Sequence, residues 1–390
     1  MFTLLQRAHV FAPQDLGVCD VLIADRKIAM IAPKVDITGL ALDVIDLDGA
    51  RLVPGFIDNH VHITGGGGEG GFSTRTPELA LSTVTSCGVT TVCGLLGTDG
   101  VTRSLPNLLA KARGLEAEGI TAYIYSGAYQ VPAPTFTGSL RSDLMIIDKV
   151  IGAGEIALSD HRSAQPTWQE YVNIVAQVRI GGMLAGKAGI VDFHTGDGKR
   201  HLDYLRKIVT DTELPYTNML PTHINRNSHL FEDAIDYALG GGFVDVTSGV
   251  NPQNSAPDAV QPSVAIRRLL DAGVALSHIL MSSDGNGSVP LFDEAGNNIG
   301  VGVADQASLL TEMRDAVVNE GVDFTAALSV ITKNVADLYH FSHKGEIQVG
   351  RDADLVALTD DYRVAHVWAN GRHMVRDGQP IVFGTFEAHA

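Results

Sequence analysis

Two histidines separated by one residue, His60 and His62, are the first side chains along the chain with an evident chemical use. They end the run VPGFIDNHVH, which predicts a buried strand, and residues i and i+2 of a strand point to the same side. Two imidazoles side by side suit a borderline metal ion such as zinc. Strand-end histidines without a metal are the alternative, so the pair must be judged with the rest of the chain.

Three further polar side chains end later apolar runs. His194 ends IVDFH, His223 ends LPTH and Asp284 ends ILMSSD. Enzymes built on parallel barrels carry their catalytic groups at the carboxyl ends of the strands. A divalent metal there would lower the pKa of its bound water to about 7 and polarise a scissile carbonyl. Asp284 could take a proton from that water and pass it to a leaving amine, so the set predicts metal-assisted hydrolysis.

The elements that must position these residues alternate along the middle of the chain. Eight short apolar runs, from LVPGFID to HILMSSD, recur between helical patterns such as those of residues 105–119, 201–212 and 305–321. This alternation predicts a parallel (β/α)8 barrel of the TIM type over residues 51–344. An open doubly wound sheet is the alternative, and the repeated placement of polar residues just after the strands favours the barrel.

The two ends of the chain have a different pattern. Residues 1–50 and 345–390 contain short alternating strands bounded by Gly, Pro or Asp, and the tripeptide ANG between two of them indicates a hairpin. We expect both ends to form one small β-sandwich domain. The predicted fold is therefore α/β, with a barrel catalytic domain and a β-domain built from the two ends.

Composition excludes several classes of protein. The 390 residues are 45% hydrophobic and 19% charged, and the net charge of −17 argues against nucleic acid or an anionic membrane as a partner. The cysteines, Cys19, Cys87 and Cys93, are odd in number and fit neither a disulfide framework nor a zinc knuckle. We find no signal peptide and no apolar stretch of membrane-spanning length, so we expect a cytoplasmic protein.

Long motifs now point to a family. VPGFIDNHVH, followed by single histidines on later strands and a late aspartate, is similar to the amidohydrolase superfamily. Within it, the chain resembles the isoaspartyl dipeptidases through GGGGEGGFSTRTPE, GLLGTD, TGSLRSD, SDHRSA, PTHINRN and SSDGNGS, in this order. The C-terminal GEIQVGRDADLVAL is typical of the superfamily's β-domain. The resemblance covers nearly the whole chain and implies hydrolysis of β-aspartyl dipeptides by a metal-activated water.

The resemblance also implies roles for residues of the metal site. His60 and His62, together with Asp284, would hold a first zinc ion, and His194 and His223 would hold a second. Asp284 would in addition be the catalytic acid and base.

For the substrate, the resemblance assigns Glu69 to the free α-amino group and Arg162 and Arg226 to carboxylates, for which a planar bidentate donor is well suited. Tyr129 would hydrogen-bond the carbonyl oxygen as its charge develops. The remaining residues that complete the pocket are Gly67, Thr98 and Ser288. One structural alternative is that Arg162 pairs with an acid such as Asp160, and another is that Tyr129 only packs.

One position departs from the family pattern. The family usually carries a carboxylated lysine that bridges two metals on the fourth strand, and counting back from SDHRSA places Glu155 there. A glutamate also supplies a carboxylate, but it is shorter by roughly 3–4 Å. Lys149 lies outside the expected strand. We expect Glu155 to bridge two zinc ions per subunit, and a single zinc ion is the second possibility.

Two other functions stay open. One is an amidohydrolase that acts on a cyclic imide or an N-acyl amino acid. The other is a catalytically inactive barrel that serves as an assembly partner, for which the change at Glu155 is the support and the intact histidine set is the objection. The expected partner is a small dipeptide, and the resemblance leads us to expect a homo-oligomer.

Overall fold

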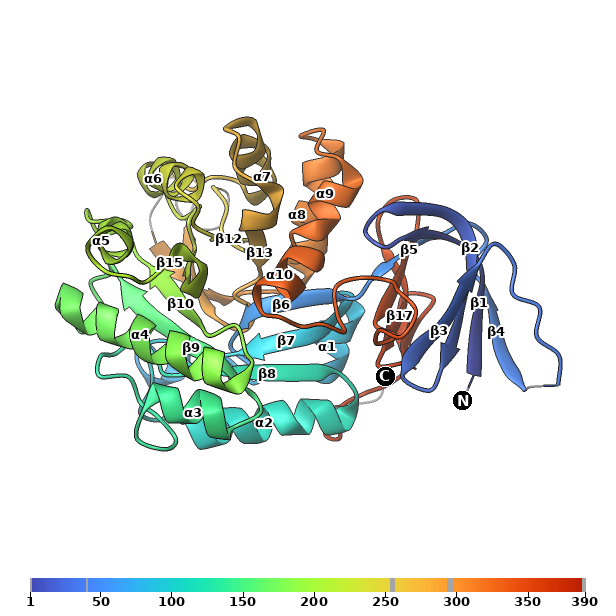
Figure 1. The fold of residues 1–390 in the computed structure, drawn as a ribbon, viewed down its shortest axis with the longest axis horizontal. Helices are drawn as coiled ribbons and strands as arrows, with labels where there is room; N and C mark the ends of the chain where they lie inside the picture. Colours follow the sequence, from blue (N-terminus) through green and yellow to red (C-terminus); the bar gives the residue numbers. More distant parts are fainter. Residues whose placement is uncertain (1, 40, 253–256, 293–297, 388–390) are drawn as a thin grey trace.

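The computed structural model describes residues 2–39, 41–252, 257–292 and 298–387. Within these residues the fold is mixed α/β, as the sequence predicts, with a curled parallel sheet beside a second sheet (Figure 1). None of the described helices combines the length and the hydropathy that crossing a bilayer requires.

Strands from both ends of the chain share a nine-stranded sheet in the order β19-β18-β17-β16-β5-β1-β2-β3, with β4 paired to β1. The strands are β1 (Phe2–Phe11), β2 (Asp15–Ala24), β3 (Lys27–Ala32), β4 (Leu42–Asp46), β5 (Arg51–Pro54), β16 (Leu355–Leu358), β17 (Val364–Ala369), β18 (Arg372–Arg376) and β19 (Gln379–Pro380). The first strand of the chain, β1, and the last, β19, both belong to this sheet. The sheet includes β5, which the sequence predicts as part of the catalytic domain. The strand pairing of the nine-stranded sheet therefore continues past residue 50. The limits of the two domains stay a prediction.

The parallel sheet has the order β11-β10-β9-β8-β7-β6, and β12 and β13 form a separate parallel pair. The strands are β6 (Phe56–Val61), β7 (Val89–Gly94), β8 (Thr121–Ser126), β9 (Val150–Leu158), β10 (Ile190–Thr195), β11 (Met219–Thr222), β12 (Val244–Thr247) and β13 (Ile279–Ser282). Each falls on one of the predicted apolar runs, but β9 begins earlier than its run EIALSD suggests. All residues of β6, β7, β9 and β10 are buried, as expected for parallel strands covered on both faces. A hairpin of β14 (Ser288–Phe292) and β15 (Asn298–Val303) follows β13.

Helices follow most of the parallel strands and cover the outside of the curled sheet (Figure 1). They are α1 (Leu81–Ser86), α2 (Leu105–Glu118), α3 (Leu140–Ile146), α4 (Trp168–Ala185), α5 (Asp203–Asp211), α6 (Ser228–Leu239), α7 (Pro262–Asp271), α8 (Ala307–Val318), α9 (Phe324–Ser329) and α10 (Lys333–Leu338). Three short 3-10 turns occupy Phe72–Thr74, Tyr216–Asn218 and Leu276–His278. The helices predicted at residues 105–119, 201–212 and 305–321 are α2, α5 and α8.

Local capping explains where helices begin and end. The side chain of Ser104 accepts a hydrogen bond from the backbone of Asn107 at the start of α2, and Gly119 ends that helix with a φ of 135°. Thr167 and Glu170 form a capping box at the start of α4. These signals set the residues at which α2 begins and ends and at which α4 begins, and so set the ends of the loops that lead into these helices.

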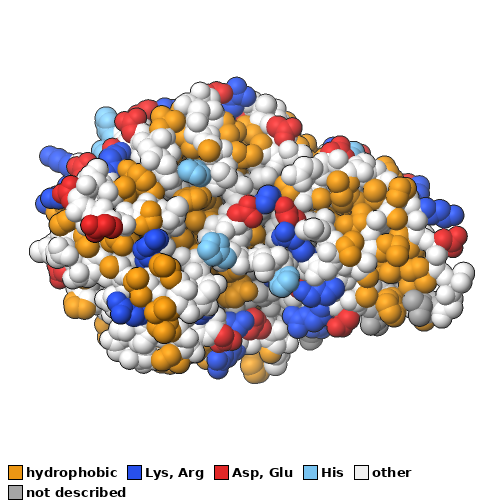
Figure 2. Space-filling view, in the orientation of Figure 1, with side chains coloured by type: hydrophobic (Ala, Val, Ile, Leu, Met, Phe, Trp, Pro, Cys, Tyr) orange, Lys and Arg blue, Asp and Glu red, His pale blue; other side chains and the backbone are white. Residues whose placement is uncertain are grey.

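The surface carries charged side chains of both signs, as the composition of the chain leads one to expect. On the face shown in Figure 2, acidic and basic side chains lie interspersed, and hydrophobic side chains gather over the nine-stranded sheet. No single basic region dominates this face.

Candidate metal centre

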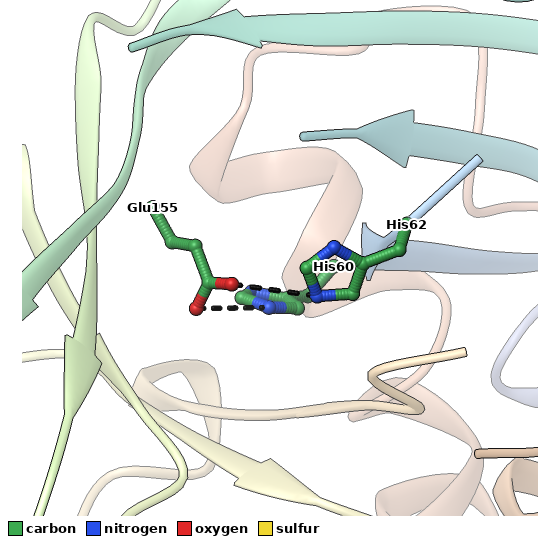
Figure 3. A group of neighbouring side chains, drawn as sticks. All are labelled: His60, His62 and Glu155. Atoms are coloured by element: carbon green, nitrogen blue, oxygen red, sulfur yellow. Dashed lines mark ion pairs between the residues drawn. The ribbon is translucent and has the colours of Figure 1, made fainter. Parts of the chain in front are cut away.

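Six side chains from five strands converge at the carboxyl edge of the parallel strands. Glu155 of β9 is in the middle, and Figure 3 shows the rings of His60 and His62 directed toward its carboxylate. Oε1 of Glu155 lies 3.4 Å from Nε2 of His62, and Oε2 lies 3.4 Å from Nε2 of His60. Oε2 also lies 3.0 Å from Nδ1 of His194 and 3.6 Å from Nε2 of His223. The glutamate therefore faces both predicted histidine pairs.

Asp284 closes the group from the loop after β13. Its Oδ1 lies 3.1 Å from Nε2 of His62 and 3.6 Å from Nε2 of His60. Three overlapping sets have ligand atoms within 4.8 Å of one another: His60, His62 and Glu155; His60, His223 and Asp284; and Glu155, His194 and His223. The fold thus brings together all six residues that the sequence predicts as metal ligands.

The donor atoms of this centre fit a metal ion. Nε2 of His60, Nε2 of His223 and Oδ1 of Asp284 are buried and have no hydrogen-bond partner. Buried polar atoms are normally satisfied, because leaving one unpaired costs about 1–3 kcal/mol. A divalent cation would satisfy these nitrogen and oxygen donors together.

The electrostatics of the centre agree with this fit. Burial lowers the pKa of His223 to about 3, so its ring is neutral, as a metal ligand must be. Its Nδ1 lies 2.7 Å from Oγ1 of Thr247, which leaves Nε2 directed at the centre. Burial opposes ionisation of Glu155, yet the charges of His60 and His194 hold the pKa of its carboxyl well below the usual value. Lys149 lies just before β9 and pairs with Glu116, outside this group.

A cavity of about 1140 Å³ opens beside the centre. Its lining includes His62, Glu155, His194 and Asp284, while His60 and His223 lie behind them. All predicted substrate residues also line it: Gly67, Glu69, Thr98, Tyr129, Arg162, Arg226 and Ser288. The fold therefore places the predicted metal ligands and substrate residues around one space.

Tyr129 occupies the inner part of the cavity. Its hydroxyl lies 2.7 Å from Nδ1 of His194, and its side chain is buried. Burial, with Glu155 nearby, holds the pKa of Tyr129 well above its usual value. The phenol thus keeps its proton and can donate it in a hydrogen bond to a substrate carbonyl beside the centre.

Arg162 forms the pair that the sequence analysis gave as a structural alternative. Its Nε and one terminal nitrogen donate to the two carboxylate oxygens of Asp160, at 3.0 and 2.7 Å. Its other terminal nitrogen lies 3.6 Å from Oε1 of Glu69 at the cavity. Arg226 approaches His194 to 3.5 Å, and its Nε is buried without a partner. Both arginine side chains line the cavity, so their guanidinium groups stand where an anionic ligand would bind.

Glu69 is held by two other predicted residues. Its Oε1 accepts from the hydroxyl of Thr98 at 2.8 Å, and its Oε2 from that of Ser288 at 3.3 Å. Gly67, in the same glycine-rich loop, has a φ of 69°, and a Cβ there would lie 2.6 Å from the carbonyl oxygen of Thr74. This position needs glycine so that the loop can fold back and place Glu69 at the cavity.

Two aspartates that contact the centre were not among the predicted site residues. Asp160 accepts from Nε2 of His194 at 3.0 Å, and Asp192 lies 3.2 Å from Nδ1 of His60. Asp192 carries a signal in the sequence, because it is two residues before His194 on one strand and so points to the same side. Asp160 was considered only as a partner of Arg162.

Comparisons with known proteins agree with this geometry. Residues 201–374 match the amidohydrolase family. The β-aspartyl dipeptidase of Fervidobacterium islandicum AW-1, solved in complex with β-Asp-Leu, is 42% identical, covers 100% of both chains and superposes with a TM-score of 0.90. The chain belongs to the amidohydrolase family.

Other proteins are similar to this chain at lower identity or over a shorter part of it. A D-hydantoinase structure is 18% identical, covers 99% of this chain and 98% of its own, and has a TM-score of 0.72, which shows a common fold. A dihydroorotase of Staphylococcus aureus is 33% identical over 107 residues, which are 27% of this amidohydrolase and 24% of that protein. Adenine deaminase 1 of Carboxydothermus hydrogenoformans is 22% identical over 391 residues, and the match spans 57% of it.

Proposed function

We propose that this amidohydrolase cleaves β-aspartyl dipeptides at a binuclear zinc centre bridged by Glu155. The observation that carries the proposal is the 42% identity over the whole chain to the Fervidobacterium islandicum AW-1 β-aspartyl dipeptidase, solved with β-Asp-Leu. The cavity supports it, because two arginines and the carboxylate of Glu69, which is not one of the predicted metal ligands, stand beside the metal-binding side chains. That set of charges complements a zwitterion with an additional carboxylate.

His60, His62 and Asp284 would hold one zinc ion, His194 and His223 the other, and Glu155 would lie between them. Imidazole and carboxylate donors suit zinc. When bound, the metal would supply an activated water and polarise the scissile carbonyl. A single zinc ion per subunit is the second possibility, because Glu155 is shorter than a carboxylated lysine.

The chain's own residues carry the remaining steps. Glu69 binds the substrate's α-amino group, and Arg162 and Arg226 bind its carboxylates. Tyr129 donates a hydrogen bond to the carbonyl oxygen as charge develops there. As the oxygen of water bonds to the β-carbonyl carbon, Asp284 accepts the water proton, and it returns that proton to the leaving nitrogen when the C–N bond breaks.

The finer features of the fold belong to the same proposal. We infer that strands β6 to β13 close into a (β/α)8 barrel, which is supported by the parallel bridge between Val61 and Gly285 after β13. Residues 1–50 and 345–390 would form a β-sandwich domain beside the barrel at residues 51–344. A homo-oligomer and a cytoplasmic location complete the proposal.

The test is hydrolysis by zinc-loaded protein of β-Asp-Leu against α-Asp-Leu. We expect turnover of the β-linked peptide and none of its α-linked isomer. An N-acetyl amino acid and a cyclic imide serve as comparison substrates. Turnover of either of these, with β-Asp-Leu left intact, would replace this proposal with a different amidohydrolase activity.

A further inference from the structure

A second layer of buried carboxyl groups lies beneath the predicted metal ligands. Asp58 of β6, Asp192 of β10 and Asp245 of β12 all have side chains with no exposed surface. The interior of parallel barrels is usually filled by branched apolar residues, and a buried carboxylate is costly unless it has a partner. The partners of these three groups therefore indicate what each one does.

Two of the three are held by groups on neighbouring strands. The backbone N–H of Ser283 donates to Asp58 at 3.0 Å, and its hydroxyl donates to the same carboxylate. The hydroxyls of Thr222 and Ser282 donate to Asp245 at 2.6 and 2.5 Å. These hydrogen bonds join adjacent parts of the parallel strands, which is a structural role.

Asp192 instead faces a predicted metal ligand. Its Oδ1 and Oδ2 lie 3.2 and 3.4 Å from Nδ1 of His60, and both side chains are fully buried. In the described part of the chain, no other group donates a hydrogen bond to this carboxylate. Its place two residues before His194 on β10 sets it on the same side of the strand, one step deeper than the metal centre.

The direction of this contact fixes the His60 ring. A carboxylate oxygen accepts hydrogen bonds, so this contact is a hydrogen bond from His60 when the ring proton lies on Nδ1. Nε2 then carries the lone pair, and it points at Oε2 of Glu155 and Oδ1 of Asp284, at 3.4 and 3.6 Å. We propose that Asp192 is a positioning residue that fixes the orientation and tautomer of His60, so that Nε2 is presented to the metal centre. The inference rests on the proposed metal centre but not on the peptide that the enzyme cleaves.

The test measures metal binding. Partners of this kind typically change metal affinity 10- to 100-fold, so we expect Asp192→Asn to bind zinc about 10- to 100-fold more weakly in competition with a chromophoric chelator. We also expect a changed visible spectrum of the cobalt-substituted protein, since the ligand field at one ion changes. Because neither readout uses a substrate, failure to cleave β-Asp-Leu would leave this test unaffected.

Asp245→Asn is the matched control, since Asp245 is equally buried but bonded to the hydroxyls of Thr222 and Ser282. We expect it to keep the wild-type zinc affinity. Wild-type zinc affinity and an unchanged cobalt spectrum in folded Asp192→Asn would overturn the proposal. A loss of zinc affinity in Asp245→Asn equal to that in Asp192→Asn would also overturn it.

A measurement on the wild-type protein covers the case in which Asp192→Asn does not fold. Nitrogen-15 spectra of zinc-loaded protein with labelled histidines report which ring nitrogen of His60 carries the proton. A proton on Nδ1 is expected, and a proton on Nε2 would overturn the proposal.

Discussion

Two parts of the active-site cavity differ in how their polar atoms are satisfied. The metal floor consists of side chains on or just after strands, all of them buried except the partly buried Asp284: His60, His62, Glu155, His194, His223 and Asp284. The substrate wall consists of more exposed side chains on loops and at the start of β14: Glu69, Thr98, Arg162, Arg226 and Ser288. In the floor, nitrogen and oxygen atoms of His60, His223 and Asp284 lack partners. In the wall, Glu69 is bonded to Thr98 and Ser288.

This difference shows that the two parts are built for different ligands. The unpaired ring nitrogens of His60 and His223 and the unpaired carboxylate oxygen of Asp284 can all bind a cation through a lone pair. A cation is therefore the ligand that satisfies them together. In the wall, Glu69 and Arg162 already have partners, so a substrate must exchange hydrogen bonds with them, whereas Nε of Arg226 has none. Substitutions in the floor should therefore affect metal binding and turnover, while those in the wall should affect substrate affinity.

The largest effect is expected at Asp284. Asp284→Asn removes the group that transfers the proton, and a positioned acid or base contributes about 10²–10⁴-fold, so we expect kcat for β-Asp-Leu to fall by that factor. The thermal unfolding midpoint of the metal-free protein should change little, because asparagine keeps the size and shape of the side chain. Retained kcat would remove Asp284 from the proton-transfer step.

Tyr129 is the next test, since it lies between floor and wall. Tyr129→Phe deletes the hydroxyl near His194 and should lower kcat about 10²–10³-fold, the usual loss for one oxyanion donor. Zinc content, measured by atomic emission, should stay at the wild-type value. An unchanged kcat would mean that Tyr129 only packs.

Arg226 tests the wall itself. Arg226→Ala should raise KM about 10- to 100-fold with a smaller change in kcat, because a hydrogen bond to a charged group contributes about 1.5–3 kcal/mol. Arg226→Lys, which keeps the charge but not the bidentate geometry, is the matched control and should give an intermediate KM. A loss of zinc in Arg226→Ala would break the distinction between floor and wall.

The smallest effect is expected at Ser288, which donates a neutral hydroxyl to Glu69 at 3.3 Å. Ser288→Ala should lower kcat/KM by less than about 10-fold, since such a bond is worth about 0.5–1.5 kcal/mol. Steady-state kinetics on β-Asp-Leu checks this. A larger loss, comparable with that of Tyr129→Phe, would mean that Ser288 takes part in the reaction and not only in holding Glu69.

Much of the site could be predicted because it follows from local patterns. His60, His62, His194, His223 and Asp284 each end an apolar run, and the carboxyl ends of parallel strands meet at one edge. The resemblance added the wall residues, which lie on loops or at the start of β14 and have no periodic signal of their own. Glu155 was placed by its distance from a motif, and the structure sets it between the two histidine pairs.

Other features depend on contacts between distant segments. The early start of β9 reflects pairing of Val150 with Ile124 of β8, which no property of the run EIALSD indicates. Strand β5 joins the nine-stranded sheet by pairing with β16, more than 300 residues away. The contact of Asp192 with His60 likewise crosses from β10 to β6. Strand alternation predicts only the side on which Asp192 lies and not the partner that it meets.

Anomalous scattering at the zinc edge from crystals of the zinc-loaded protein is the most direct test of the centre. The account predicts two peaks about 3.5–4 Å apart, with the carboxylate of Glu155 between them and His60 and His194 on opposite ions. A Glu155 side chain turned away from the metal would contradict the bridged centre, and so would a peak distant from His60, His62, His194 and His223.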